Sequence, residues 1–169
     1  MPPQPAPAAV EEIPIIESTI PDIAAVTVSS YFSPEQLATL RRLSDLMAPA
    51  TPGVPGAIEA EAAEFLDFLI GESPADRQAL YRVGLDELNH RAQQQFEAPF
   101  AHLTPEQADS VLAPLRAPWT ADPDPFTQFL RTAKQDILQA TQNSHTWIRE
   151  VSKRERSAGG LGMYWLPIE

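Results

Sequence analysis

The sequence predicts an all-α fold, a small helical bundle of about five helices with an extended N-terminal arm and an irregular apolar C-terminal tail. Apolar residues recur at three- and four-residue intervals over most of the chain, which is the spacing of one helix face. The 18 prolines, against only 7 glycines, fall between these segments, because proline is excluded from helix interiors. With 169 residues, 43% of them hydrophobic, the chain can bury one core.

These patterns divide the chain into three parts. We expect an extended Pro-rich arm over residues 1–30, a helical bundle domain over 31–156, and a Gly- and aromatic-rich docking tail over 157–169. Prolines in the arm hold it extended. On composition the arm is a disordered tail, or else, because it is apolar for such a tail, it lies along a partner's surface. Its candidate partner-binding residues are Ile13, Ile15, Ile16 and Ile20.

Four helix starts are predicted where a capping side chain precedes proline. Such a side chain can accept hydrogen bonds from the free N–H groups of the first turn, and proline in the first helical position loses nothing by lacking an N–H. In two of the four starts, Gln36 and Gln107 stand where a capping box needs them. The four starts are Ser33-Pro34, Ser73-Pro74, Thr104-Pro105 and Asp124-Pro125.

Five apolar stripes define the predicted helices. The second stripe consists of Ile58, Ala62, Phe65, Leu66 and Leu69. The last is the longest and runs without interruption over about seven helical turns. Named by the first and last residue of each stripe, the helices are Leu37–Met47, Ile58–Leu69, Leu80–Phe96, Ala108–Leu115 and Phe126–Val151.

A turn rich in proline and glycine joins the first two helices. Prolines end the first helix there, while Gly53 and Gly56 can take a positive φ, so we expect a rigid corner. This elbow supplies four more candidate partner-binding residues, which are Pro52, Gly53, Pro55 and Gly56.

The C-terminal tail is a strip of apolar and aromatic residues after three glycines. A chain end of this composition is unlike a solvated tail, so it folds back on the bundle or docks on another chain. Its candidate partner-binding residues are Met163, Tyr164, Trp165 and Leu166.

Charge and composition exclude several classes of function. The chain has 23 acidic and 12 basic residues, a net charge of −11, which argues against binding to nucleic acid or anionic lipid. Without cysteine it has no disulfide, iron–sulfur cluster, thiolate zinc site or covalently attached haem. The apolar runs are too short for a direct membrane span.

The start of the chain bears on its location. No Lys or Arg precedes Arg41, so the basic region of a secretory signal is missing. By its own sequence we expect the chain to be cytoplasmic, and periplasmic if it is carried by a partner or if a signal was removed.

The sequence contains no complete set of catalytic or metal-binding residues. A di-iron bundle needs two Glu-x-x-His pairs and two further Glu, whereas here Glu87 and His90 form one pair, and His145 has Gln142 in place of Glu. His102 is expected to pack or cap. The acidic residues of the second helix are expected to form a solvated face, and they are Glu59, Glu61, Glu64 and Asp67. We expect no catalytic, cofactor-binding or metal-binding residue in this chain.

Most of the predicted bundle is similar to a known family. The run from Phe32 to Thr141 resembles the small subunit, subunit 3 or γ, of gluconate 2-dehydrogenase-type flavoprotein complexes. Its most specific part is the Pro55-Gly56-Ala57 turn ahead of the Phe-Leu-Asp-Phe segment 65–68, and the Gly-Leu-Asp-Glu-Leu stretch 84–88 also fits.

The resemblance implies an all-helical, non-catalytic accessory chain in a hetero-oligomer. Its implied partner is a large FAD-dependent subunit of the glucose–methanol–choline oxidoreductase class, which oxidises sugars, glycosides or sugar acids. The small chain would carry no cofactor itself, would stabilise the large subunit and help it mature in a chaperone-like way, and would work beside a cytochrome subunit in some complexes. Two alternatives stay open: an independent metal-dependent helical enzyme using Glu87 and His90, and a self-assembling structural bundle.

Overall fold

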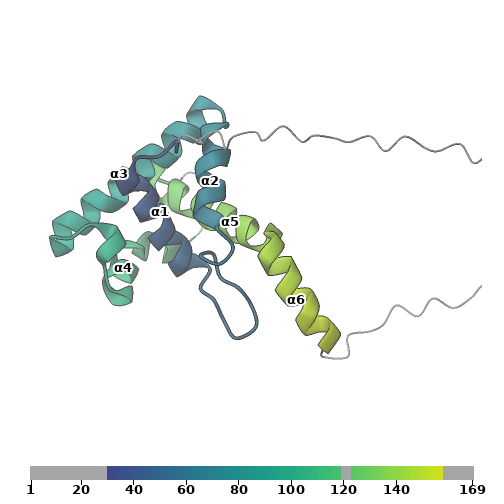
Figure 1. Cartoon of the computed structure of the whole chain (residues 1–169). Coiled ribbons are helices and arrows are strands. Elements are labelled where there is room, and N and C mark those ends of the chain that lie inside the picture. Colours follow the sequence, from purple (N-terminus) through teal and green to yellow (C-terminus); the bar gives the residue numbers. More distant parts are fainter. Residues whose placement is uncertain (1–29, 119–122, 158–169) are drawn as a thin grey trace, which may run out of the picture.

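The computed structural model describes residues 30–118 and 123–157, and its regular elements are helical throughout these two ranges (Figure 1). The all-α prediction is therefore confirmed. The α-helices are α1 (Pro34–Met47), α2 (Ala62–Gly71), α3 (Ala75–Phe96), α4 (Pro105–Val111), α5 (Pro125–Asn143) and α6 (His145–Ser157). Two short 3-10 helices, η1 (Phe100–His102) and η2 (Ala113–Arg116), flank α4.

A helix begins at or next to each of the four predicted starts, and three of the four predicted caps are confirmed. Ser33 and Thr104 each accept a hydrogen bond from the N–H of the third helical residue, Gln36 and Gln107 respectively. Both glutamine side chains return a hydrogen bond to the backbone of the capping residue, which completes two capping boxes. Asp124 caps α5 by accepting from the first backbone N–H groups of that helix.

The predicted cap at Ser73 was wrong. Pro74 occupies the capping position of α3 and makes no side-chain hydrogen bond. The Ser73 hydroxyl donates instead to the Leu69 carbonyl at 2.7 Å, because Ser73 still belongs to the turn that leaves α2. The tight connection between α2 and α3 therefore uses this serine to satisfy the end of one helix and not the start of the next.

The core is built around the packing of α3 against α5. Gly84 of α3 faces the ring of Phe129, so close that a Cβ on Gly84 would lie 2.1 Å from the Phe129 Cγ atom. The Tyr81 ring meets Phe129 edge-on, with 5.6 Å between the ring centroids. Helices α1 and α2 cover this pair from one side. Fully buried side chains around it include Leu40, Leu43, Ile70, Leu85, Leu88, Leu130 and Ile137.

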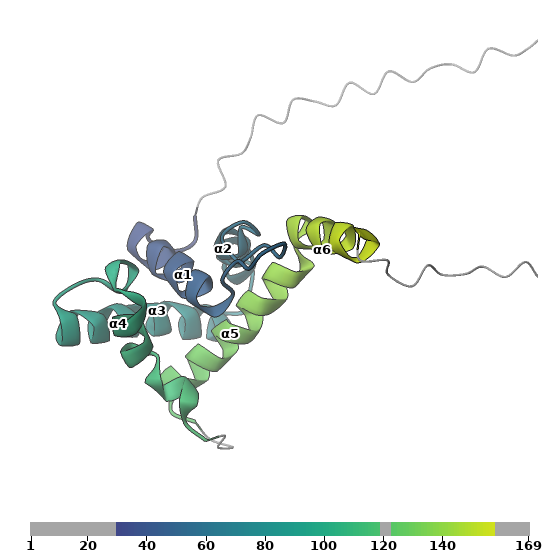
Figure 2. The ribbon, with the colours of Figure 1, turned by 90° about the horizontal axis from the view of Figure 1, so that it is seen from below.

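The prediction of one continuous helix from Phe126 to Val151 was wrong. The chain turns at Ser144, whose φ of −67° and ψ of 145° are extended values, and the Ser144 hydroxyl accepts from the Trp147 N–H at 3.1 Å. Ser144 thus ends α5 and caps α6, which is why the described part of the chain has six α-helices. From this turn α6 projects away from the bundle (Figures 1 and 2).

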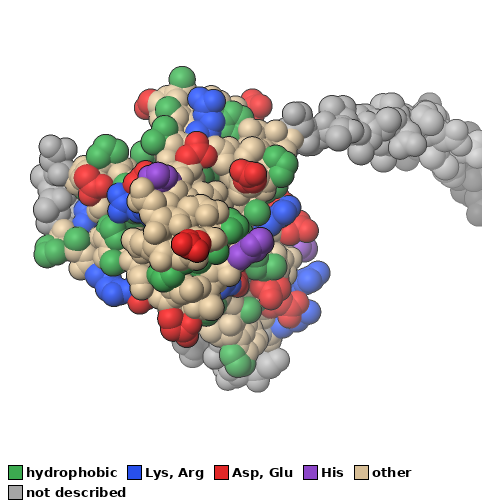
Figure 3. Space-filling model, turned by 90° about the vertical axis from the view of Figure 1, so that its left-hand side faces the viewer, with side chains coloured by type: hydrophobic (Ala, Val, Ile, Leu, Met, Phe, Trp, Pro, Cys, Tyr) green, Lys and Arg blue, Asp and Glu red, His purple; other side chains and the backbone are tan. Residues whose placement is uncertain are grey.

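The surface on the side of α3 and α4 is chemically mixed. Figure 3 shows acidic, basic and histidine side chains interspersed there with apolar ones, without a continuous basic patch on this face. Among the helices described here, none combines the length and apolar character needed to cross a lipid bilayer.

Candidate partner-binding surfaces

The elbow projects from the bundle between α1 and α2 (Figure 1). Thr51 and Val54 exchange backbone hydrogen bonds of 3.0 and 2.9 Å, so Pro52 and Gly53 form the tip of a tight turn. Gly53 has the predicted positive φ, at 76°, and the two tip residues are exposed. The Thr51–Val54 hydrogen bonds close the turn, and Figure 1 shows that the elbow points away from the bundle.

Gly56 serves a different purpose from the predicted one. Its φ is not positive, and the residue is buried. A Cβ at this position would lie 2.4 Å from the Ala50 backbone nitrogen, so only glycine allows the two sides of the elbow to approach each other. The Ala57 N–H then donates to the Ala48 carbonyl at 2.8 Å and closes the loop. Gly56 therefore shapes the elbow from inside.

The other predicted contact residues lie outside the described part of the chain. They are Ile13, Ile15, Ile16 and Ile20 of the arm, and Met163, Tyr164, Trp165 and Leu166 of the tail. Their contribution to partner binding stays a prediction.

Helix α2 presents an apolar surface that the sequence reasoning missed. Phe65 and Phe68 are 51% and 56% exposed, although Phe65 was predicted to lie on the buried stripe. Ile58, placed on the same stripe, is 50% exposed in the turn before the helix. The buried face of α2 is formed instead by Ala62, Ala63, Leu66, Asp67 and Ile70.

One buried carboxylate explains which way α2 faces. Asp67 was predicted to be solvated, but it is buried, and its two oxygens accept hydrogen bonds from the backbone N–H groups of Tyr31, at 3.2 Å, and Phe32, at 2.7 Å. A buried carboxylate needs such donors. Because Asp67 turns inward to meet them, Phe65, about 200° away around the helix, turns outward. Phe68, about 100° from Asp67, lies beside Phe65 on the exposed part of the helix surface.

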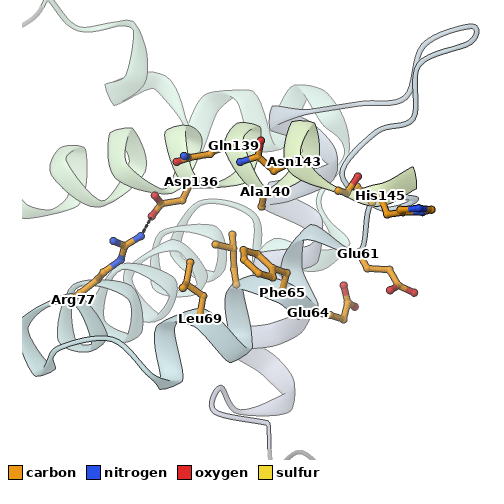
Figure 4. A pocket seen from close by; sticks show the side chains of 13 residues that line it. Glu61, Glu64, Phe65, Leu69, Arg77, Asp136, Gln139, Ala140, Asn143 and His145 are labelled. Carbon is orange, nitrogen blue, oxygen red and sulfur yellow. Dashed lines mark hydrogen bonds and ion pairs between the residues drawn. The ribbon is translucent and has the colours of Figure 1, made fainter. Parts of the chain in front are cut away.

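A groove of about 610 Å³ lies between α2 and the junction of α5 with α6 (Figure 4). Phe65 and Leu69 line it from α2, while Ala140 and Asn143 line it from α5. The turn at Ser144 bounds one end of the groove. The groove therefore adjoins the exposed aromatic surface of α2, and both apolar and polar side chains line it.

The other end of the groove is closed by a polar network. Arg77 pairs with Asp136 at 2.8 Å, and the Tyr81 hydroxyl donates to the same carboxylate at 2.6 Å. Burial, reinforced by this hydrogen bond and by the charge of Asp136, raises the pKa of Tyr81 far above its usual range. Tyr81 therefore stays protonated as a structural donor that fixes α3 to α5.

The candidate metal residues are not brought together. Glu87 accepts a hydrogen bond from Arg91 at 2.7 Å and lines a groove between α3 and α5. His90 lines a separate groove that it shares with His102. Across the described ranges, no three His, Asp or Glu side chains are grouped so that they could hold a metal ion. Nothing in this geometry favours the metal-dependent alternative.

Comparison with known proteins gives one match. The family model described as gluconate 2-dehydrogenase subunit 3 matches residues 34–154, which covers α1 to α5 and most of α6. A search of curated proteins and a search of solved structures each found no match.

Proposed function

This chain belongs to the gluconate 2-dehydrogenase subunit 3 family, and from that membership we propose that it is the non-catalytic small subunit of an oxidoreductase complex. Its partner is a large FAD-dependent subunit of the glucose–methanol–choline class that oxidises sugars, glycosides or sugar acids. The small subunit binds this partner, stabilises it and assists its maturation. The observation that carries the proposal is the family match over most of the bundle.

The surface of the bundle supports a binding role. Phe65 and Phe68 are neighbours on one face of α2 and about half exposed, and contiguous exposed apolar surface is typical of an interaction site. Aromatic side chains also dominate the centres of protein interfaces. The groove adjoins these residues, because Phe65 lines it, and the elbow precedes α2 in the chain.

In this proposal the large subunit supplies the cofactor and determines the compartment of the complex. FAD is bound by the large subunit, which supplies the redox chemistry, and the chain described here contributes no group to the flavin site. The complex resides wherever the large subunit is delivered, and the small subunit is carried with it.

Co-expression tests the proposed function. The proposed large subunit is produced with and without this chain, and soluble yield, flavin content and sugar-dependent dye reduction are measured. We expect all three to fall when the small chain is omitted, because exposed surface of the large subunit is then left uncovered. An equally soluble, flavin-loaded and active large subunit in both preparations would contradict the proposal.

A further inference from the structure

We propose that the outward face of α2 is the docking surface for the large subunit, and that it receives an apolar segment flanked by Lys or Arg. This inference rests on the proposed function and makes it specific. We define the α2 ridge as Glu61, Phe65, Phe68 and Glu72. These four positions are spaced by four, three and four residues, so they lie along one side of the helix.

The ridge has an apolar centre with an acidic residue at each end. Phe65 and Phe68 are about half exposed, and Glu61 and Glu72 are exposed beside them. Among the described residues neither Glu61 nor Glu72 has an ion pair. Glu64, one position away from the ridge, is already paired with Arg41 at 2.6 Å. The ridge therefore offers two aromatic rings between two free carboxylates.

The neighbouring groove adds depth to the ridge. Phe65 belongs to both, since it also lines the groove of about 610 Å³ against α5. Figure 4 shows Phe65 and Leu69 of α2 on one side of this hollow and Ala140 of α5 on the other, so a partner side chain that packs on Phe65 lies at its edge. Aromatic anchors beside a pocket are the usual centres of binding energy in an interface. The ridge and groove together thus suit a partner with a projecting apolar side chain.

Charge argues that the occupant is not part of this chain. The acidic ends of the ridge call for cations, yet residues 1–29 and 158–169 contain no Lys or Arg. These two segments therefore have no Lys or Arg side chain that could pair with Glu61 or Glu72. A second copy placed ridge to ridge about a two-fold axis would bring these carboxylates against each other, which is repulsive. A separate protein with basic residues around an apolar segment satisfies both requirements.

Exchange kinetics in the complex test the ridge. The co-expressed complex is immobilised through the large subunit, and release of the small subunit is followed in an excess of labelled wild-type chain. For Phe65→Ser combined with Phe68→Ser we expect release to accelerate by about 100-fold, the effect of losing two anchor residues. The matched control is Val83→Ser, because Val83 is 64% exposed but lies on α3. Its release rate should equal that of the wild type.

A second pair of variants tests the charge requirement. Glu72→Lys changes the net charge by two, and so does the control Gln94→Lys combined with Gln95→Lys, at exposed positions of α3. We expect only Glu72→Lys to slow association, and the difference to shrink in high salt. Urea midpoints of the isolated variants check that all remain folded, which is expected since every changed side chain is exposed.

The outcomes separate this inference from the proposed function. If no complex forms even with the wild-type chain, the proposed function fails. If the complex forms and the ridge variants exchange like the wild type, the docking inference is overturned and the proposed function stands. Since the chain has no cysteine, Phe65→Cys provides a single thiol for maleimide labelling. If maleimide labels the isolated Phe65→Cys variant only after residues 1–29 or 158–169 are removed, the occupant of the ridge is part of this chain and the inference is overturned. A dimer at neutral pH that the ridge variants abolish would also overturn it, because the occupant would then be a second copy.

Discussion

Gly84 shows how one missing side chain holds two helices together. Alanine stabilises a helix interior by about 1 kcal/mol relative to glycine. A Gly84→Ala substitution would therefore stabilise α3 if no side chain packed against this position. Here the added Cβ would lie 2.1 Å from the Phe129 Cγ atom, and Phe129 is fully buried against Tyr81. The close approach of α3 and α5 therefore outweighs the helix propensity.

We expect Gly84→Ala to lower the free energy of unfolding by about 2 kcal/mol, the usual cost of overpacking a buried site. Urea denaturation followed by circular dichroism measures it, with Gln94→Ala as the control on the exposed side of the same helix. Adding Phe129→Leu to Gly84→Ala should recover part of the loss by making room for the Cβ. A stability equal to or above that of the wild type would show that the helices can separate at no cost.

At the scale of the element, α5 depends on a titratable cap. The hydroxyl of Thr127, with the backbone N–H groups of Thr127 and Phe126 and the nearby charge of Arg91, holds the pKa of Asp124 below its usual 3.8. The unfolded chain thus takes up this proton at a higher pH than the folded one. The carboxylate stabilises the start of α5 above pH 3.8, and this contribution is lost as the pH falls through the folded value.

Asp124→Asn separates this titration from the hydrogen bonds. Asparagine is also a good capping residue, so at neutral pH we expect only a small loss of stability. Between about pH 5 and pH 2 the urea midpoint of the variant should fall less steeply than that of the wild type, because Asn has no proton to bind. Parallel curves over this range would show that Asp124 does not contribute to the acid sensitivity.

The elements that local sequence could predict are those whose signals are local. The caps at Ser33, Thr104 and Asp124 act within one helical turn, so the starts of α1, α4 and α5 could be located from residue types alone. The break at Ser144 could not, because the apolar spacing continues through Trp147 and Val151. Serine is also an ordinary helix residue when it does not cap.

The exposed face of α2 could not be predicted from the spacing of apolar residues. Residues 65–70 are apolar on nearly every side, so the pattern does not say which face is buried. The choice is made by Asp67, whose carboxylate meets backbone donors more than thirty positions earlier in the chain. A surface helix of a small bundle that has apolar residues on nearly every side leaves some of them exposed, and this pattern predicts a binding face.

At the scale of the whole molecule, the net charge opposes self-association of the isolated chain through this apolar face. The net charge is −11 at pH 7 and the pI is about 4.6, so copies repel one another at neutral pH. Near the pI that repulsion vanishes, while the Asp124 carboxylate, whose pKa lies below its usual 3.8, is still ionised and caps α5. Phe65 and Phe68 can then meet another copy without repulsion from the net charge of the two chains.

We therefore expect the isolated chain to be monomeric at pH 8 and to associate reversibly near pH 4.6, its pI, because exposed aromatic surface promotes association once net charge is lost. Light scattering across this range at low salt measures the change. Phe65→Ser combined with Phe68→Ser should reduce association at the same pH, and Val83→Ser should not, since its side chain lies on α3. If the double variant associates as strongly as the wild type, the α2 ridge is not the surface on which copies meet, and the aromatic exposure of α2 has no consequence for solubility.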